Sequence, residues 1–67
     1  MITLTVNGEK RRLPAETDLV TFLKELEVDA RLVAVAHNGD VIPRKDYASV
    51  QLREGDTVEI VRMVGGG

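Results

Sequence analysis

Only one stretch of this chain has the apolar spacing of a helix, and that limit constrains the fold more than any other feature. Among the 67 residues, apolar side chains recur at intervals of three and four at Leu19, Phe22, Leu23 and Leu26. Thr17 or Asp18 can cap the start of this segment, and Asp18 also suits the positive end of the helix dipole. The pattern predicts one amphipathic helix of about ten residues. Because a single apolar stripe needs a sheet to cover it, we expect an α+β fold.

The other segments have the alternation or the composition of strands. Ile, Leu and Val alternate with Thr over residues 2–6, and Asn7-Gly8 then predicts a two-residue hairpin turn. The return strand, residues 9–13, is polar except at its last residue, as expected for an edge strand that ends before Pro14. Further strands are expected at residues 32–36 (a buried inner strand), 41–42, 50–52 and 57–64.

The first and last strands are both long, and both mix threonine with β-branched residues. We expect them to pair in parallel at the middle of the sheet, with the helix crossing one face. This arrangement is a ubiquitin-like β-grasp fold, an α+β domain with a mixed sheet of about four to five strands covered by one helix. The expected division is a domain over residues 1–64 followed by a flexible glycine tail at 65–67. The residues expected to pack against the helix stripe are Ile2, Leu4, Val6, Val33, Val35, Val58 and Ile60.

Composition argues against several classes of function. The chain has no cysteine, which excludes disulfides, thiolate nucleophiles and cysteine-ligated metals. Its single histidine, His37, is interpreted as a partly exposed residue at a strand end, since no second ligand lies near it in sequence. The net charge is −2, the only basic run is Lys10-Arg11-Arg12, and one Tyr and one Phe are too few to stack bases. We expect a soluble, cytoplasmic protein that binds neither nucleic acid nor membrane.

Three glycines, Gly65, Gly66 and Gly67, follow the last predicted strand. The other glycines lie in Asn-Gly or Glu-Gly turn sequences that need a positive φ, whereas these three serve no turn. They form an unbranched tether ending in a carboxylate, which a narrow enzyme channel would admit. This pattern favours a protein whose reactive group is its own C-terminus. The alternative is that the glycines have no function, because chain ends tolerate small, disordered residues.

Three local sequences occur together in an informative order. Residues 38–44 read Asn-Gly-Asp-Val-Ile-Pro-Arg, residues 55–60 read Gly-Asp-Thr-Val-Glu-Ile, and residues 64–67 read Val-Gly-Gly-Gly. The first resembles the Asn-Gly-x-Val-Val-Pro-Arg turn of the ThiS-type sulfur carriers of thiamin biosynthesis. The second resembles that family's entry into its last strand, and the third its di-glycine end. The similarity runs the whole length, and His37 departs from it, because an aliphatic residue is frequent at this position in the family.

The resemblance implies a chemistry and a set of partners. In that family the terminal carboxylate, here Gly67, is adenylated with ATP and converted to a thiocarboxylate whose sulfur goes to thiazole formation. The implied partners are a ThiF-type adenylating enzyme, a thiazole synthase and a sulfur-donating protein. The chain itself would be a protein substrate and not an enzyme, without a cofactor or metal of its own. We expect docking through the sheet face away from the helix, at the apolar positions Val61, Met63 and Val64 that lead into the tail.

Two other functions fit the same features. The molybdopterin-synthase small subunit is also a β-grasp protein with a di-glycine end, although that family is usually longer and its tail more often reads Ser-Gly-Gly. A detached TGS-like domain carries similar middle motifs and would be a non-reactive interaction module whose glycines are incidental. The enzyme that accepts the sulfur distinguishes a molybdopterin-synthase small subunit from a ThiS-type carrier. Uptake of sulfur distinguishes both carriers from a TGS-like module.

Overall fold

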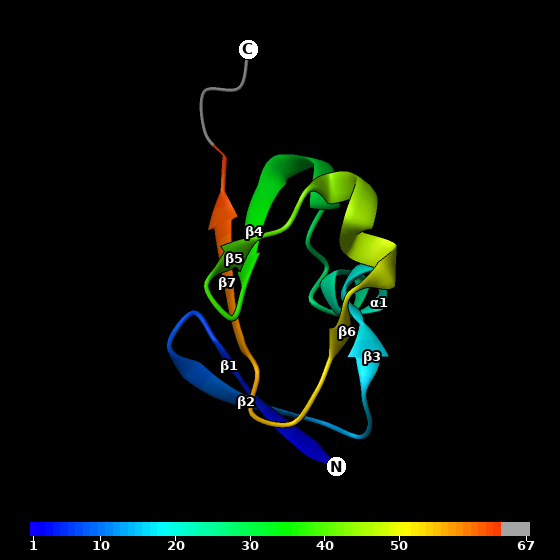
Figure 1. Ribbon diagram of the computed structural model, residues 1–67, viewed down its shortest axis with the longest axis vertical. Coiled ribbons are helices and arrows are strands. Elements are labelled where there is room, and N and C mark those ends of the chain that lie inside the picture. Colours follow the sequence, from blue (N-terminus) through cyan, green and yellow to red (C-terminus); the bar gives the residue numbers. More distant parts are fainter. Residues whose placement is uncertain (64–67) are drawn as a thin grey trace.

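The computed structural model describes residues 1–63, and they form one mixed sheet with a helix packed across it (Figure 1). The five strands lie in the order β2-β1-β7-β4-β5. A short second sheet joins β3 to β6. The elements in chain order are β1 (Ile2–Val6), β2 (Glu9–Leu13), β3 (Thr17–Asp18), α1 (Leu19–Glu25), the 3-10 helix η1 (Ala30–Leu32), β4 (Val33–His37), β5 (Asp40–Val41), the 3-10 helix η2 (Arg44–Ser49), β6 (Gln51–Leu52) and β7 (Thr57–Arg62).

The sheet has the predicted topology. β1 and β7 pair in parallel at its centre, and the remaining neighbours pair antiparallel. β2 is an edge strand that ends at Leu13, directly before Pro14. The hairpin turn at Asn7-Gly8 has positive φ at both residues, 50° and 82°, as a type I′ turn requires. The fold is therefore the expected ubiquitin-like β-grasp arrangement.

The core lies between α1 and one face of the sheet. Leu4, Leu19, Leu52 and Val58 are completely buried, and Phe22, Leu23 and Val35 are almost so. Asp18 caps α1, because one of its carboxylate oxygens accepts a hydrogen bond from the Thr21 N–H at 3.0 Å. A hydrogen bond from the Thr21 hydroxyl, together with this backbone bond, lowers the pKa of Asp18.

Some details differ from the sequence-based expectation. The helix has seven residues and ends early, because Glu27 adopts a left-handed conformation with φ 58°. The N–H groups of Glu27 and Val28 then bond the carbonyls of Lys24 and Leu23, which is a Schellman motif with Glu in the place usually taken by Gly. Leu26 follows the helix as its cap and is only partly buried.

The prediction of a strand at residues 32–36 is wrong for residue 32. Leu32 belongs to η1 and is 51% exposed, and β4 starts one residue later. The segment at 44–49, which has no clear period, is η2, and it contributes the buried Tyr47 to the core. The predicted strand at 50–52 exists as β6, but it pairs with β3 outside the main sheet. No helix within residues 1–63 has the length and the apolar character needed to cross a membrane.

Candidate functional site

The face of the sheet turned away from α1 has an apolar area at the end where β7 finishes. Alternate residues of a strand point to opposite faces, and directly paired residues point to the same face. Val35 pairs with Ile60 on the helix side, so Ala34 and its partner Val61 lie on the other side. The same rule places Ala36 and its β5 partner Val41 on the side away from the helix. We call this area the open-face patch; it comprises Leu32, Ala34, Ala36, Val41, Val61 and Met63.

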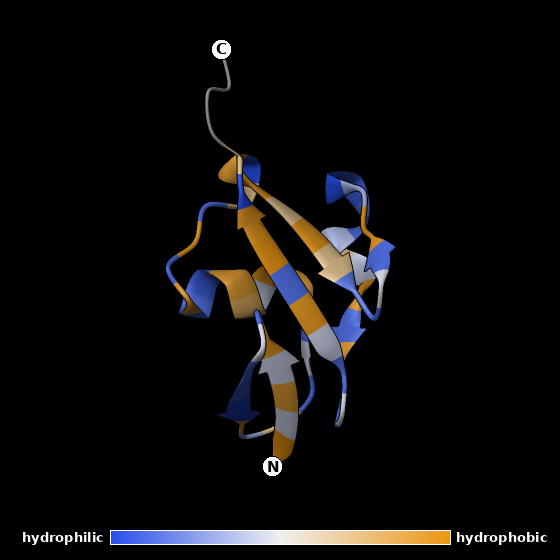
Figure 2. Ribbon diagram, turned by 90° about the vertical axis from the view of Figure 1, so that its left-hand side faces the viewer, coloured by the Kyte–Doolittle hydropathy of each residue, from blue (hydrophilic) through white to orange (hydrophobic). Residues whose placement is uncertain are grey.

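The larger side chains of the open-face patch are well exposed. Val41 is 76% exposed, Val61 is 61% exposed, and Met63 is 51% exposed. The Met63 N–H donates to the Leu32 carbonyl at 2.8 Å, so the exposed Leu32 lies beside the end of β7. Figure 2 shows β7 and β4 side by side, with hydrophobic residues along both strands. A contiguous group of exposed apolar residues is typical of an interaction surface, whereas scattered ones are not.

Polar residues border the open-face patch on the same face. Glu59, two residues before Val61, is exposed, and the neighbouring strand β1 presents Thr3 and Thr5 there. Beyond β1, the edge strand β2 adds Lys10 and Arg12, which pair with Thr5 and Thr3. The apolar area is therefore confined to the β7–β4–β5 side and reaches the last described residue.

The predicted site residues divide into two groups. Val61 and Met63 lie on the predicted face and are exposed, although nothing in the structure tests their role. Val64, Gly65, Gly66 and Gly67 lie outside the described residues. Sequence reasoning missed four members of the same surface, namely Leu32, Ala34, Ala36 and Val41. Residues 32–36 are all apolar, so the sequence gave no sign of which of them stay uncovered by the helix.

The two sides of β7 are held differently. On the β4 side, strand pairing continues to the end of β7. On the β1 side, it covers only Thr57 and Val58. The side chain of Asn7 then replaces a strand: the Ile60 N–H donates to Asn7 Oδ1 at 2.7 Å, and Asn7 Nδ2 donates to the Ile60 carbonyl at 3.2 Å. β7 is thus held in place on both sides up to Ile60.

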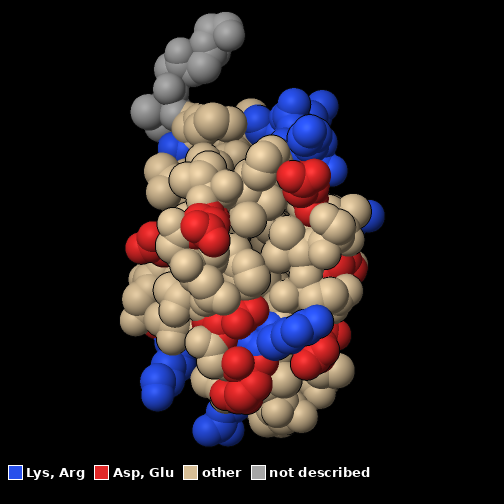
Figure 3. All heavy atoms as spheres, viewed as in Figure 1, with Lys and Arg blue, Asp and Glu red and all other residues tan. Residues whose placement is uncertain are grey.

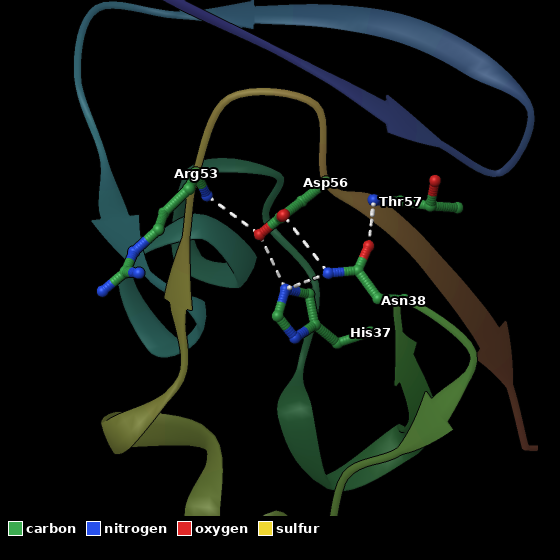
Figure 4. A network of polar contacts seen from close by, with 5 residues as sticks. All are labelled: His37, Asn38, Arg53, Asp56 and Thr57. Atoms are coloured by element: carbon green, nitrogen blue, oxygen red, sulfur yellow. Dashed lines mark hydrogen bonds and ion pairs between the residues drawn. The ribbon is translucent and has the colours of Figure 1, made fainter.

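A polar network fixes the opposite end of β7 (Figure 4). His37 Nε2 lies 2.7 Å from Asp56 Oδ2, and Asn38 Nδ2 donates to Asp56 Oδ1 at 3.2 Å. The backbone N–H of Arg53 also donates to Asp56 Oδ2, at 3.0 Å. Asn38 Oδ1 accepts from the Thr57 N–H at 2.8 Å, which ties the β4–β5 turn to the start of β7.

This network is structural in character. Partial burial raises the pKa of Asp56, but the hydrogen bonds from His37, the Arg53 backbone and Asn38 outweigh it, so the pKa is lowered. His37 is partly buried at the end of β4, which agrees with its interpretation from sequence. Its partner Asp56 is 19 positions away, so sequence spacing gave no sign of the pair. Within residues 1–63, no three His, Cys, Asp or Glu side chains are grouped to hold a metal ion.

A surface hollow of about 340 Å³ lies on the helix side of the sheet. Its volume is at the lower end for small-molecule sites. Ile60 lines it, which explains why this residue is only partly buried and not in the core as expected. The remaining lining residues are Val6, Asn7, Glu9, Lys10, Arg11, Leu26 and Val28. The charged residues among them are exposed, so the hollow lacks the desolvated polar groups of a catalytic site.

The sequence matches a described protein family over nearly its whole length. The sequence model of the ThiS family matches residues 4–67. The sulfur carrier protein ThiS of Thermus thermophilus is 37% identical over 62 residues, which are 92% of this chain and 95% of that protein. A crystal structure of the thiamine biosynthesis protein ThiS of Geobacter metallireducens superposes with a TM-score of 0.88 at 32% identity, covering 98% of this chain and all of that one.

A longer relative contains a similar segment. The thiazole synthase of Paramagnetospirillum magneticum is 44% identical over 64 residues, which are 96% of this chain. The chain spans about a fifth of the length of that protein, because the matched segment is 20% of it.

Proposed function

The chain belongs to the ThiS family, and we propose that it is a sulfur carrier of thiamin biosynthesis whose Gly67 carboxylate receives the sulfur. The observation that carries the proposal is the family match over residues 4–67, which includes all three terminal glycines. The open-face patch supports it, because an exposed apolar surface directly before the tail gives partner enzymes a place to bind. The proposal requires a free α-carboxylate on Gly67.

The chemistry begins with a carboxylate that needs activation. An α-carboxyl group has a pKa of about 3.3–3.7, so it is ionised near neutral pH. A carboxylate is a poor acyl donor because its leaving group would be oxide. Attack of a carboxylate oxygen on the α-phosphorus of ATP releases pyrophosphate and forms an acyl adenylate. A persulfide sulfur on a donor protein then displaces AMP and forms an acyl disulfide. A thiol reductant attacks the donor sulfur of this disulfide, which leaves a thiocarboxylate on Gly67 and a disulfide between the reductant and the donor.

Three kinds of partner take part in this proposal. A ThiF-type adenylating enzyme supplies ATP and the metal chemistry, a sulfur-donating protein supplies the persulfide, and a thiazole synthase accepts the sulfur. A thiazole synthase that contains a segment similar to this chain supports the last of these partners. The chain contributes the substrate carboxylate and the docking surface, and it acts as a protein substrate in the cytoplasm and not as an enzyme.

Docking is proposed at the open-face patch, with Val61, Met63 and Val64 nearest to the tail. Residues 1–64 would form the recognised domain, and residues 65–67 would enter the partner's active site. Glycine suits a narrow channel because it lacks a Cβ. The apolar patch, rather than a pocket within the chain, then provides the binding energy.

Intact mass spectrometry tests the proposal. The chain is incubated with ATP, the adenylating enzyme and a sulfur donor, and the expected gain equals replacement of one oxygen by sulfur. Deleting Gly67, or adding one residue after it, should abolish the gain, since one residue moves the carboxylate by about 3.3–3.6 Å from near-attack distance. Gly66→Val should also fail, because a β-branched side chain enters the channel. Gly65→Ala is the matched control and should retain most of the yield.

Each outcome of this experiment assigns a function. Full sulfur uptake by the Gly67 deletion, which ends on the Gly66 carboxylate, would show that the reaction does not require a carboxylate at the position of Gly67. No gain in the unaltered chain would favour a non-reactive module of the TGS type. A thiocarboxylate that a molybdopterin synthase large subunit consumes, and a thiazole synthase does not, would move the carrier to the other pathway.

A further inference from the structure

Basic side chains gather at the end of the molecule where β7 finishes. Figure 3 shows Lys and Arg side chains concentrated at this end, over η1 and η2. Residues from three elements contribute, and all of them are exposed. We call this group the basic rim; it comprises Arg31 of η1, Arg44 and Lys45 of η2, and Arg62 of β7.

Contacts in the backbone bring these elements together. Arg62 pairs with Val33 at the first position of β4, two residues after Arg31. The Ile42 N–H donates to the Val35 carbonyl at 2.9 Å, so the chain runs beside β4 just before η2 begins. Asp29 connects the two 3-10 helices electrostatically: hydrogen bonds from Arg31 and the charges of Arg31 and Arg44 lower its pKa to about 2.

The charge at this end is opposite to that of the whole molecule. Two acids, Asp29 and Asp46, lie within two residues of these four cations in sequence, and together the six groups have a formal charge of +2. The remaining five cations and nine acids give −4, and the total is −2. Arg31 occupies both oxygens of Asp29, with contacts of 2.9 Å and 3.1 Å. The residues around the end of β7 therefore have a net positive charge, whereas the rest of the chain is net negative.

The basic rim borders the open-face patch. Arg31 precedes Leu32 in sequence, and Arg62 stands between Val61 and Met63. An apolar centre with a charged margin is the usual construction of a protein interface. Polar contacts at such a margin contribute to association rate and orientation more than to affinity.

We propose that the basic rim recognises an acidic protein surface around the channel entrance of the adenylating enzyme and so orients the carrier with its tail foremost. This inference rests on the proposed function. The Gly67 carboxylate must approach the triphosphate of ATP, and an overall anionic carrier is repelled from that site. A positive leading end opposed by a negative body turns the carrier toward an acidic surface during encounter.

A nucleic acid fits these charges less well. The −4 charge of the remaining surface would repel a phosphate backbone, which offers negative charge along its whole length. The four cations of the basic rim form a compact group that matches a local acidic cluster. An acidic protein surface is therefore the partner that the charge distribution favours.

Stopped-flow association with the adenylating enzyme at several salt concentrations tests the inference. The double variant R44E/K45E reverses half of the basic rim, and R11E/R12E on β2 makes the same change in net charge far from it. At low salt, we expect R44E/K45E to associate at least about tenfold more slowly, with a weaker salt dependence than the unaltered chain. R11E/R12E should change the rate constant by less than about threefold, because its charges lie outside the interface. R44Q/K45Q should fall between them, and circular dichroism checks that all variants are folded.

The outcomes separate this inference from the function on which it rests. Equal slowing by R44E/K45E and R11E/R12E would show that only the net charge of the carrier matters. An association rate constant that does not depend on salt would show that charge has no role. Either result, with normal sulfur uptake, overturns the inference. Absence of adenylation in the unaltered chain would instead overturn the proposed function, and this inference with it. Tighter binding of the chain to a random-sequence oligonucleotide than to the enzyme would also overturn it.

Discussion

The two faces of the sheet have similar apolar residues and opposite surroundings. On the helix side, Val35 and Val58 are nearly or completely buried. On the open side, Val41 and Val61 are mostly exposed. Val58 and Val61 belong to the same strand, three residues apart. The pleat of β7 therefore gives one strand a covered face that stabilises the domain and an exposed apolar face that is the proposed docking surface.

Substitutions on the covered and the uncovered face of the sheet should have different effects. Removing buried apolar volume leaves a cavity and destabilises the fold. Removing exposed apolar volume has little effect on stability but removes contact area from an interface. Matched substitutions on the two faces can therefore test whether stability and docking are independent.

The largest expected effect compares two leucines. Leu23→Ala should lower the free energy of unfolding by about 2–5 kcal/mol, because Leu23 is almost fully buried against the sheet. Leu32→Ala should lower it by no more than about 0.5–1 kcal/mol, since its side chain is half exposed. Urea denaturation of both variants measures the difference. Equal losses would show that the open face also holds the fold together.

The sequence predicts the local features of this fold well. The turns at Asn7-Gly8 and Asn38-Gly39, the cap at Asp18 and the apolar stripe of α1 all depend on residues close in sequence. The parallel pairing of β1 with β7 was also predicted, because both strands share the same alternation. The turns, the cap and the stripe need no knowledge of distant contacts, whereas the β1–β7 pairing joins the two ends of the chain and was inferred from the similarity of the two strands.

The errors concern features that distant residues decide. Residues 32–36 are uniformly apolar, so their pattern does not show which side of β4 stays uncovered; the position of α1 decides that. The burial of Tyr47 depends on η2 packing beside the helix, and nothing in the local pattern indicates it. Asp56 serves as the partner of His37 only because two turns meet in space. The open-face patch could be predicted only in the part that lies on β7.

The second prediction concerns the end of β7 remote from the patch. Asp56→Asn should lower stability at neutral pH by about 1–3 kcal/mol, because a charged acceptor of several hydrogen bonds is lost. The pKa of Asp56 is lowered in the folded state. Its stabilising effect is therefore present above the unfolded value of about 3.9 and disappears as pH falls through the folded value. Thermal unfolding between neutral pH and pH 3 should show the two proteins converging in acid.

Asp56→Asn should leave binding at the open-face patch unchanged. The network lies at the opposite end of β7 from the open-face patch. The variant should therefore bind the adenylating enzyme as the unaltered chain does at a temperature where both are folded. A constant stability difference at all pH values would contradict the role assigned to the Asp56 charge.

The third prediction introduces a charge into the open-face patch. Met63→Asp should leave the thermal midpoint nearly unchanged and raise the Michaelis constant for adenylation about tenfold, because an unpaired carboxylate would be buried in the interface. Thr57→Asp is the control: it adds the same charge to the same face of the sheet, at the start of β7 and outside the patch. Equal Michaelis constants for the two variants would place docking elsewhere, for example near Tyr47.

The smallest effect tests the comparison within one strand. Val61→Thr keeps the shape and the strand preference of the side chain, so stability should change by less than about 0.5 kcal/mol. Adenylation at low carrier concentration should fall by about two- to fivefold, since a hydroxyl replaces a methyl group in the apolar contact. Val58→Thr makes the identical change on the covered face, where the hydroxyl is fully buried, and should cost about 1–3 kcal/mol of stability. Because the two substitutions differ only in the side of β7 that they alter, equal stability losses would contradict the separation of tasks between the faces.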